Sequence, residues 1–223
     1  MLSVHRILLR GSALSGVSKP TRRMLSSKPQ KSEVDIIRER TSLPAFQELL
    51  LNPATKPIDI IAELEKSTIY DNHFGFKDIS RVMPFAFSWD GSTDACIEQL
   101  NTSKIPKERL PGSHFSTPMV TVFDYINENV CGHPGLIHGG MTATIAHTTM
   151  MLAAVLNARK GARIVSKSLN MDYRKPIYTE NFVKVHAWLY EREEENFKAA
   201  LHIYSLKDEI LVEATSNLAV ESL

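Results

Sequence analysis

The clearest pattern in the sequence is an alternation of apolar and polar residues along its C-terminal part. In one segment, for example, Val183, Val185 and Leu189 fall on the same side of an extended chain. A two-residue period of this kind is typical of antiparallel strands that pack on one face. Four segments carry the pattern and are predicted to be strands: 163–173, 181–190, 197–206 and 210–220.

The segment 141–158 has a different pattern, because its residues are apolar on almost every face. A helix of this length that is apolar nearly all round is expected to be buried. The run Arg159-Lys160-Gly161 places basic residues and a glycine where helices end. The β-branched and aromatic residues of 119–126 predict one more strand before the helix. The predicted fold class is therefore α+β, with an antiparallel sheet wrapped around a long central helix.

The patterns before residue 119 are weaker. Residues 26–55 contain short stretches with helical spacing, broken by two prolines, and predict a tether with short helices rather than a domain. An amphipathic helix is predicted over 58–65 and a short strand over 82–88, while 91–117 is rich in loops.

Charge is distributed unevenly along the chain. Residues 1–32 contain seven basic side chains, seven serines and no acid, whereas 33–223 carries a net charge of −6. A basic, serine-rich, acid-free segment of this kind is typical of a mitochondrial presequence, and we expect the mature chain to start near Ser26. A basic disordered tail is the alternative; a secretory signal is disfavoured because an uninterrupted apolar core is missing. The expected location is the mitochondrial matrix.

The composition also excludes several classes of protein. The mildly acidic body argues against general binding to nucleic acid, and no apolar run approaches the roughly 18 residues that span a bilayer. Two cysteines, Cys96 and Cys131, do not make a disulfide framework. His133 and His138 lack a cluster of further ligands around them in the sequence, so neither a metal nor a cofactor is predicted.

Two motifs in these elements resemble a known family. GHPGLIHGG ends at Gly140 and enters the central helix, and SKSLNMDYRKPI follows the helix at 166–177. In these positions they resemble the hotdog-fold thioesterase superfamily, in particular the group that contains 4-hydroxybenzoyl-CoA thioesterase and the thioesterases of phenylacetyl-CoA pathways, with mitochondrial relatives in animals and fungi. The likeness covers 118–223, and more loosely 56 onward. The chain is thus divided into a presequence (1–25), a tether (26–55) and a hotdog thioesterase-like domain (56–223).

The glycines at the start of the predicted helix are the first candidate site. Backbone amides there carry partial positive charge, and glycine lets a substrate approach them. The resemblance implies that the Gly139 amide polarises a thioester carbonyl, that His138 and Gly140 contact the substrate, and that the Ser166 hydroxyl orients water. A glycine turn that serves only packing is the alternative.

Position 147 departs from the family. Relatives that hydrolyse acyl-CoA place an acid nine residues after the histidine of His-Gly-Gly, but here the residue is His147, and 130–169 contains no acid. Nine helical steps of about 100° turn the chain to the opposite side. A site that uses both positions therefore needs two helices, which predicts a homodimer, or a dimer of dimers, with shared sites. His147 is either a general base that activates water or a packed core histidine.

Two functions follow from these observations. The first is a mitochondrial acyl-CoA thioesterase in which His147, Gly139 and Ser166 carry the chemistry. The second is a catalytically inactive hotdog protein that binds acyl-CoA or an acyl-carrier thioester, or serves as a scaffold in a mitochondrial assembly. The missing acid favours the second function, and the intact glycine motif favours the first.

Overall fold

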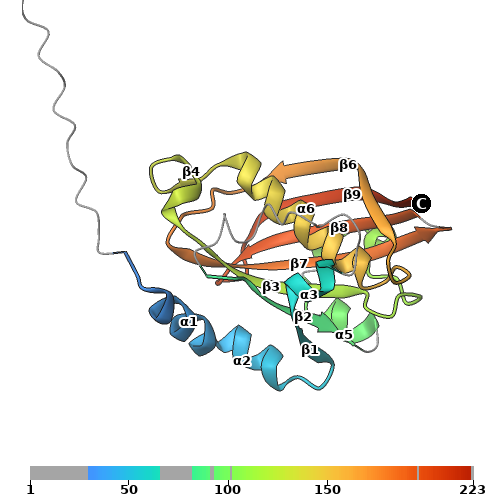
Figure 1. Cartoon of the computed structure of the whole chain (residues 1–223), viewed down its shortest axis with the longest axis horizontal. Coiled ribbons are helices and arrows are strands. Elements are labelled where there is room, and N and C mark those ends of the chain that lie inside the picture. Colours follow the sequence, from blue (N-terminus) through green and yellow to red (C-terminus); the bar gives the residue numbers. More distant parts are fainter. Residues whose placement is uncertain (1–29, 66–81, 91–92, 101, 195, 222–223) are drawn as a thin grey trace, which may run out of the picture. The chain divides into compact units, whose positions relative to one another are not determined.

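A twisted antiparallel sheet forms the framework of the protein in a computed structural model, which describes residues 30–65, 82–90, 93–100, 102–194 and 196–221 (Figure 1). Within these residues seven strands pair in the order β1-β2-β3-β7-β8-β9-β6. The predicted presequence lies outside the described residues. The strands are β1 (Thr55–Ile58), β2 (Phe85–Trp89), β3 (Met119–Ile126), β6 (Arg163–Tyr173), β7 (Asn181–Glu193), β8 (Asn196–Ser205) and β9 (Ile210–Glu221).

The central helix α6 (Gly139–Val155) packs along one face of this sheet (Figure 1). Ile145, Ala146 and Met150 are almost completely buried in the main core, together with apolar side chains of β3, β7, β8 and β9. The short helix α3 (Ile60–Glu65) adds Ile60 and Leu64 to the same core. The predicted α+β class, with an antiparallel sheet around a buried helix, is confirmed.

The ends of α6 differ from the prediction for reasons that the packing explains. The helix begins at Gly139, two residues early, because the His138 side chain caps it. It ends at Val155, where the Asn157 side chain donates hydrogen bonds to the carbonyls of Ala153 (2.8 Å) and Thr117 (2.7 Å). The strand predicted at 82–88 lies slightly later, at 85–89.

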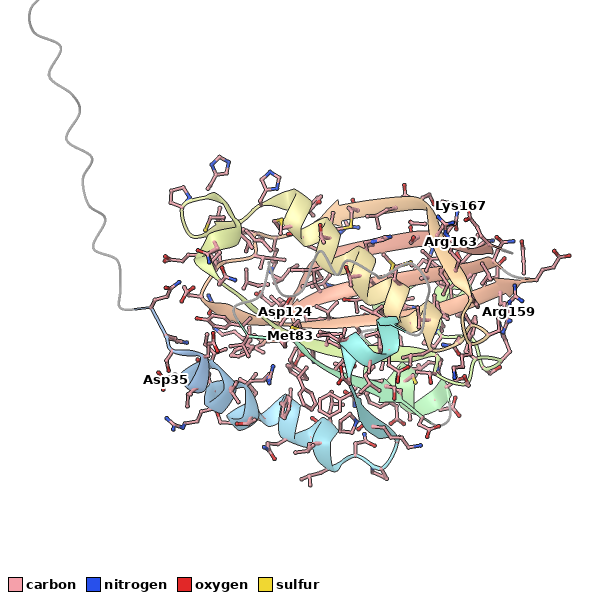
Figure 2. All side chains as sticks on the ribbon, in the orientation of Figure 1. Asp35, Met83, Asp124, Arg159, Arg163 and Lys167 are labelled. Carbon is pink, nitrogen blue, oxygen red and sulfur yellow. The ribbon has the colours of Figure 1, made fainter. Side chains whose placement is uncertain are left out.

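A second layer covers the opposite face of the sheet. It contains α1 (Glu33–Ser42), α2 (Pro44–Leu51), α5 (Thr93–Glu98) and the short 3₁₀ turns η1 (Thr102–Lys104) and η2 (Lys107–Arg109). Phe46 of α2 lies with its ring centroid 5.3 Å from that of Phe87 and 5.5 Å from that of Phe123. The Arg40 guanidinium of α1 donates a 2.7 Å hydrogen bond to the carbonyl of Met83, which Figure 2 labels.

This second layer changes the picture of residues 26–55. The expected short helices are present, but they do not form a separate tether, because Ser32–Leu223 make up one compact unit. The physical reason is that β2 and β3 are apolar on both faces, so the outer face also needs cover. None of the helices in the described residues is both long and apolar enough to span a membrane.

Candidate active site at the start of the central helix

A small hairpin delivers the chain to the start of α6. Its strands β4 (Cys131–His133) and β5 (Leu136–Ile137) pair with each other, and Gly135 turns the chain between them at φ 77°. The His138 amide then donates a 2.8 Å hydrogen bond to the Val130 carbonyl. A Cβ atom on Gly132 would lie only 3.0 Å from the Cα atom of His138. Glycine at position 132 thus allows the hairpin to hold the helix start in place.

His138 is the N-cap of α6. Its Nδ1 atom accepts a 3.0 Å hydrogen bond from the Gly140 amide, and its backbone carbonyl accepts bonds from Met141 and Thr142. A Cβ atom on Gly140 would lie 3.1 Å from the imidazole, so this glycine makes room for the cap. The sequence predicted that His138 and Gly140 both face the substrate. In the structure the two residues are bonded to each other, which occupies the Gly140 amide, and their contact with a substrate stays a prediction.

The Gly139 amide remains open. It is the first amide of the helix and has no acceptor within its own helix, and no acceptor for it is found among the described residues. Its carbonyl accepts a 2.9 Å hydrogen bond from the hydroxyl of Tyr173, at the end of β6. Tyr173 therefore fixes the orientation of this peptide group. It lies inside the SKSLNMDYRKPI motif, but its role depends on a contact across 34 residues.

A pocket of about 320 Å³ opens beside the Gly139 amide. One part of its wall is apolar, and the basic residues Arg174 and Lys175 lie at its edge. None of its lining residues is acidic, although Arg174 is paired with Glu213 and Asp172 and Lys175 with Glu209, just outside the pocket. The lining residues are His133, Leu136, Ile137, Gly139, Thr142, Tyr173, Arg174, Lys175, Pro176, Ile177 and Val212.

His147 does not line this pocket. It lies eight residues from Gly139, or about 12 Å along the helix axis, on the half-buried stripe that also carries Thr144. Burial lowers the pKa of the His147 imidazole, so the neutral form persists at neutral pH. No hydrogen bond to its side chain is found within the part of the chain that the structure describes. One copy of the protein therefore does not bring His147 to the open amide.

Ser166 is also remote from the helix start. It lies on β6 seven residues before Tyr173, or about 23 Å along the strand. It is flanked by Arg163 and Lys167, which Figure 2 shows at the end of the molecule away from the β4 hairpin. Its hydroxyl lies 3.4 Å from that of Ser216, next to a bulge in the strand. Of the predicted residues, the structure brings Gly139, His138 and Gly140 together, and leaves His147 and Ser166 elsewhere in the same chain.

No group of three or more histidine, cysteine, aspartate or glutamate side chains that would suit a metal ion occurs among the described residues. The open helix-start amide, beside a pocket with an apolar wall, can polarise a carbonyl group.

A comparison with protein families adds a likeness for this part of the chain. Residues 134–212, from the β4 hairpin to the start of β9, match the family model described as the thioesterase superfamily. This segment is similar to the thioesterase superfamily. The resemblance predicted from the two sequence motifs is confirmed, and the helix start with its open amide lies inside the thioesterase segment.

Solved structures similar to this chain include several thioesterases. A thioesterase from Haemophilus influenzae matches with 19% identity and a TM-score of 0.45, over 50% of this chain and 77% of that protein. Zebrafish thioesterase superfamily member 2 matches with 18% identity and a TM-score of 0.43, over 47% of this chain and 75% of that protein. A Bacillus halodurans protein solved with CoA matches with 22% identity and a TM-score of 0.44, over 47% of this chain and 68% of that protein.

Proposed function

We propose that the protein binds acyl-CoA thioesters at the start of α6 and hydrolyses them with water. The observation that carries the proposal is the open Gly139 amide beside a pocket without acidic residues, within a thioesterase-superfamily segment. The thioester carbonyl oxygen accepts the Gly139 N–H, while the acyl group lies along the apolar wall. Arg174 and Lys175 lie at the edge where the phosphates of CoA would pass.

His147 is the proposed base. In its neutral form it accepts a proton from water as the water oxygen attacks the thioester carbon, and the Gly139 amide holds the oxyanion that forms. The intermediate then collapses, the C–S bond breaks, and the imidazolium returns the proton to the departing CoA sulfur. The products are a carboxylic acid and CoA. No acyl-enzyme forms, because position 147 lacks a carboxylate.

We further propose a homodimer in which His147 of one copy completes the site at Gly139 of the other. The support is geometric, since the two residues of one chain are about 12 Å apart along the helix. β6 is also the last strand of the sheet, so one side of its Arg163–Tyr173 backbone has no partner strand in the described residues. Long unpaired edges of this kind are usually covered. The matrix location rests on the composition of residues 1–32 and stays a prediction.

The second candidate function is binding without turnover, as an acyl-CoA or acyl-carrier protein. The observation that favours it is the position of His147, which is half-buried, lacks a hydrogen-bonded partner among the described residues and does not line the pocket. In that case His147 is a packing residue and the thioester stays intact.

A thiol-release assay with short-, medium- and long-chain acyl-CoA separates the two functions. For the hydrolase, we expect wild type to release CoA and His147→Ala to lower kcat by about 10²-fold or more, as for loss of a general base. His147→Gln is the matched control, since it is polar but does not titrate, and it should be as slow as His147→Ala. An inert wild type that binds acyl-CoA and gains activity as His147→Asp would establish the binding protein instead.

A further inference from the structure

A second and larger pocket, of about 490 Å³, lies on the face of the sheet opposite α6. The η1–η2 turns form one wall, with Lys104 and Arg109, and strand residues of β6 to β9 form the other. The loop is anchored to the sheet, because the indole N–H of Trp188 donates a 2.6 Å hydrogen bond to the Arg109 carbonyl. This pocket shares only Arg174 with the pocket at the helix start.

The charges of this pocket are only partly balanced. Arg174 contacts both acidic lining residues, with its Nε atom 2.6 Å from Glu213 and its Nη2 atom 2.9 Å from Asp172. These two carboxylates are therefore already paired with a cation. Lys104 and Arg109 have no acidic partner among the described residues. Two cations on the loop wall are thus left to attract an anion.

His202 adds a buried polar side chain to the wall of the same pocket. Only 5% of the residue is exposed, and its Nδ1 atom lies 3.0 Å from the Tyr204 hydroxyl. Its Nε2 atom lies 3.5 Å from a carboxylate oxygen of Glu213. A carboxylate on that side favours the tautomer with the proton on Nε2. Burial, aided by the charges of Lys104 and Arg174 and opposed by Glu213, lowers the pKa of His202 to about 4, so the ring is a neutral donor.

We infer that this pocket binds a phosphorylated small molecule of nucleotide size, separately from the acyl-CoA site. Lys104 and Arg109 contact its phosphate oxygens. The Asp172 oxygen that Arg174 does not contact accepts a hydrogen bond from a hydroxyl or amino group of the ligand. The volume is within the range of ordinary small-molecule sites. The inference stands on this pocket alone and does not depend on thioester hydrolysis.

Calorimetric titration of the full chain with ADP, and with inorganic pyrophosphate as the minimal probe, tests the inference. We expect both probes to bind. Lys104→Gln and Arg109→Gln should each weaken binding about five-fold and the double variant about 25-fold, as for two partly exposed charge contacts that act independently. Lys107→Gln is the matched control, because Lys107 lies in the same turns but does not line the pocket, and it should leave affinity unchanged.

Absence of binding by both probes, or equal weakening by all three single variants, would overturn the inference. A further titration with ADP in saturating CoA separates a free metabolite from the nucleotide end of CoA. Unchanged ADP affinity supports a separate site. Loss of ADP binding in the presence of CoA would mean that CoA occupies this pocket, which contradicts the proposed independence.

Discussion

At the scale of single residues, two side chains determine which amide at the start of α6 is open to a ligand. His138 accepts the Gly140 amide, and Tyr173 donates to the Gly139 carbonyl. Both contacts leave the Gly139 N–H as the free donor. The selection is therefore made by hydrogen bonds, and the glycines supply only the space.

Gly139→Pro removes this donor with little other change. Proline is favoured at the first position of a helix, and His138 already has the extended backbone, φ −68° and ψ 134°, that a residue before proline requires. We expect kcat for thioester hydrolysis to fall by about 10²- to 10³-fold, as for loss of one oxyanion donor. The midpoint temperature of thermal unfolding should stay within a few degrees of the wild-type value. An unchanged kcat would show that the Gly139 N–H does not stabilise the oxyanion.

Mixing this variant with His147→Ala tests whether two copies share each site. In a random mixture of equal amounts, half of the dimers contain both variants, and each of these carries one intact site. The mixture should therefore recover about a quarter of wild-type activity if the homodimer shares its sites as proposed. A mixture as inactive as its components would show that Gly139 and His147 do not act together across an interface.

The site could be predicted from the sequence only in part, for physical reasons. The helix-start glycines are local, so the motif alone indicated that Gly139 lies at the start of the helix, and its catalytic role stays a prediction. Tyr173 was not found, because its contact with Gly139 depends on how β6 pairs in the sheet. The roles of His147 and Ser166 stay predictions, since one chain does not bring either of them to the pocket.

At the scale of elements, α2 determines whether the N-terminal helices belong to the domain. Phe46→Ala should lower the free energy of unfolding by about 3–5 kcal/mol, because the ring is 3% exposed and contacts Phe87 and Phe123. Leu50→Ala, on the same helix but 47% exposed, should change it by less than about 0.5 kcal/mol. Urea unfolding measures both. Equal small effects would mean that α2 is not part of the cooperative unit.

Elements with a clear period were predictable, and those that need a second packing surface were not. β3 and β6 have the predicted bounds. β3 is rich in β-branched and aromatic residues, and in β6 apolar and polar residues alternate. β1 was missed, since its four residues contain a proline and only its pairing with β2 makes it a strand. The outer helices were found as helices, but their burial depends on the apolar outer face of β2 and β3.

At the scale of the whole molecule, two buried histidines link stability to pH. Burial lowers the pKa of His202 to about 4 and that of His186 well below its usual value. The unfolded chain then binds more protons than the folded one below pH 6.5, so stability falls as pH falls. Between pH 7 and pH 5, His202 alone should account for a loss of about 2 kcal/mol, and His186 adds to it.

Urea unfolding at the two pH values measures this loss. His202→Asn keeps an amide for the Tyr204 hydroxyl but does not titrate, so the decrease between pH 7 and pH 5 should be smaller by about 2 kcal/mol in this variant. Lys107→Gln is a surface control and should retain the full decrease. The same pH dependence in all three proteins would show that His202 is charged in the folded state.

The order of strands in the sheet has a consequence for how the chain folds during synthesis. α2 comes early in the sequence, yet the apolar cluster into which its Phe46 packs includes Trp188 of β7. β3 likewise pairs with β7, which lies more than 50 residues later in the chain. The N-terminal segments therefore leave the ribosome long before their docking surface exists. Contacts so distant in sequence slow folding and leave apolar surface exposed in the meantime. We expect the nascent chain to depend on chaperones until β7 has been made.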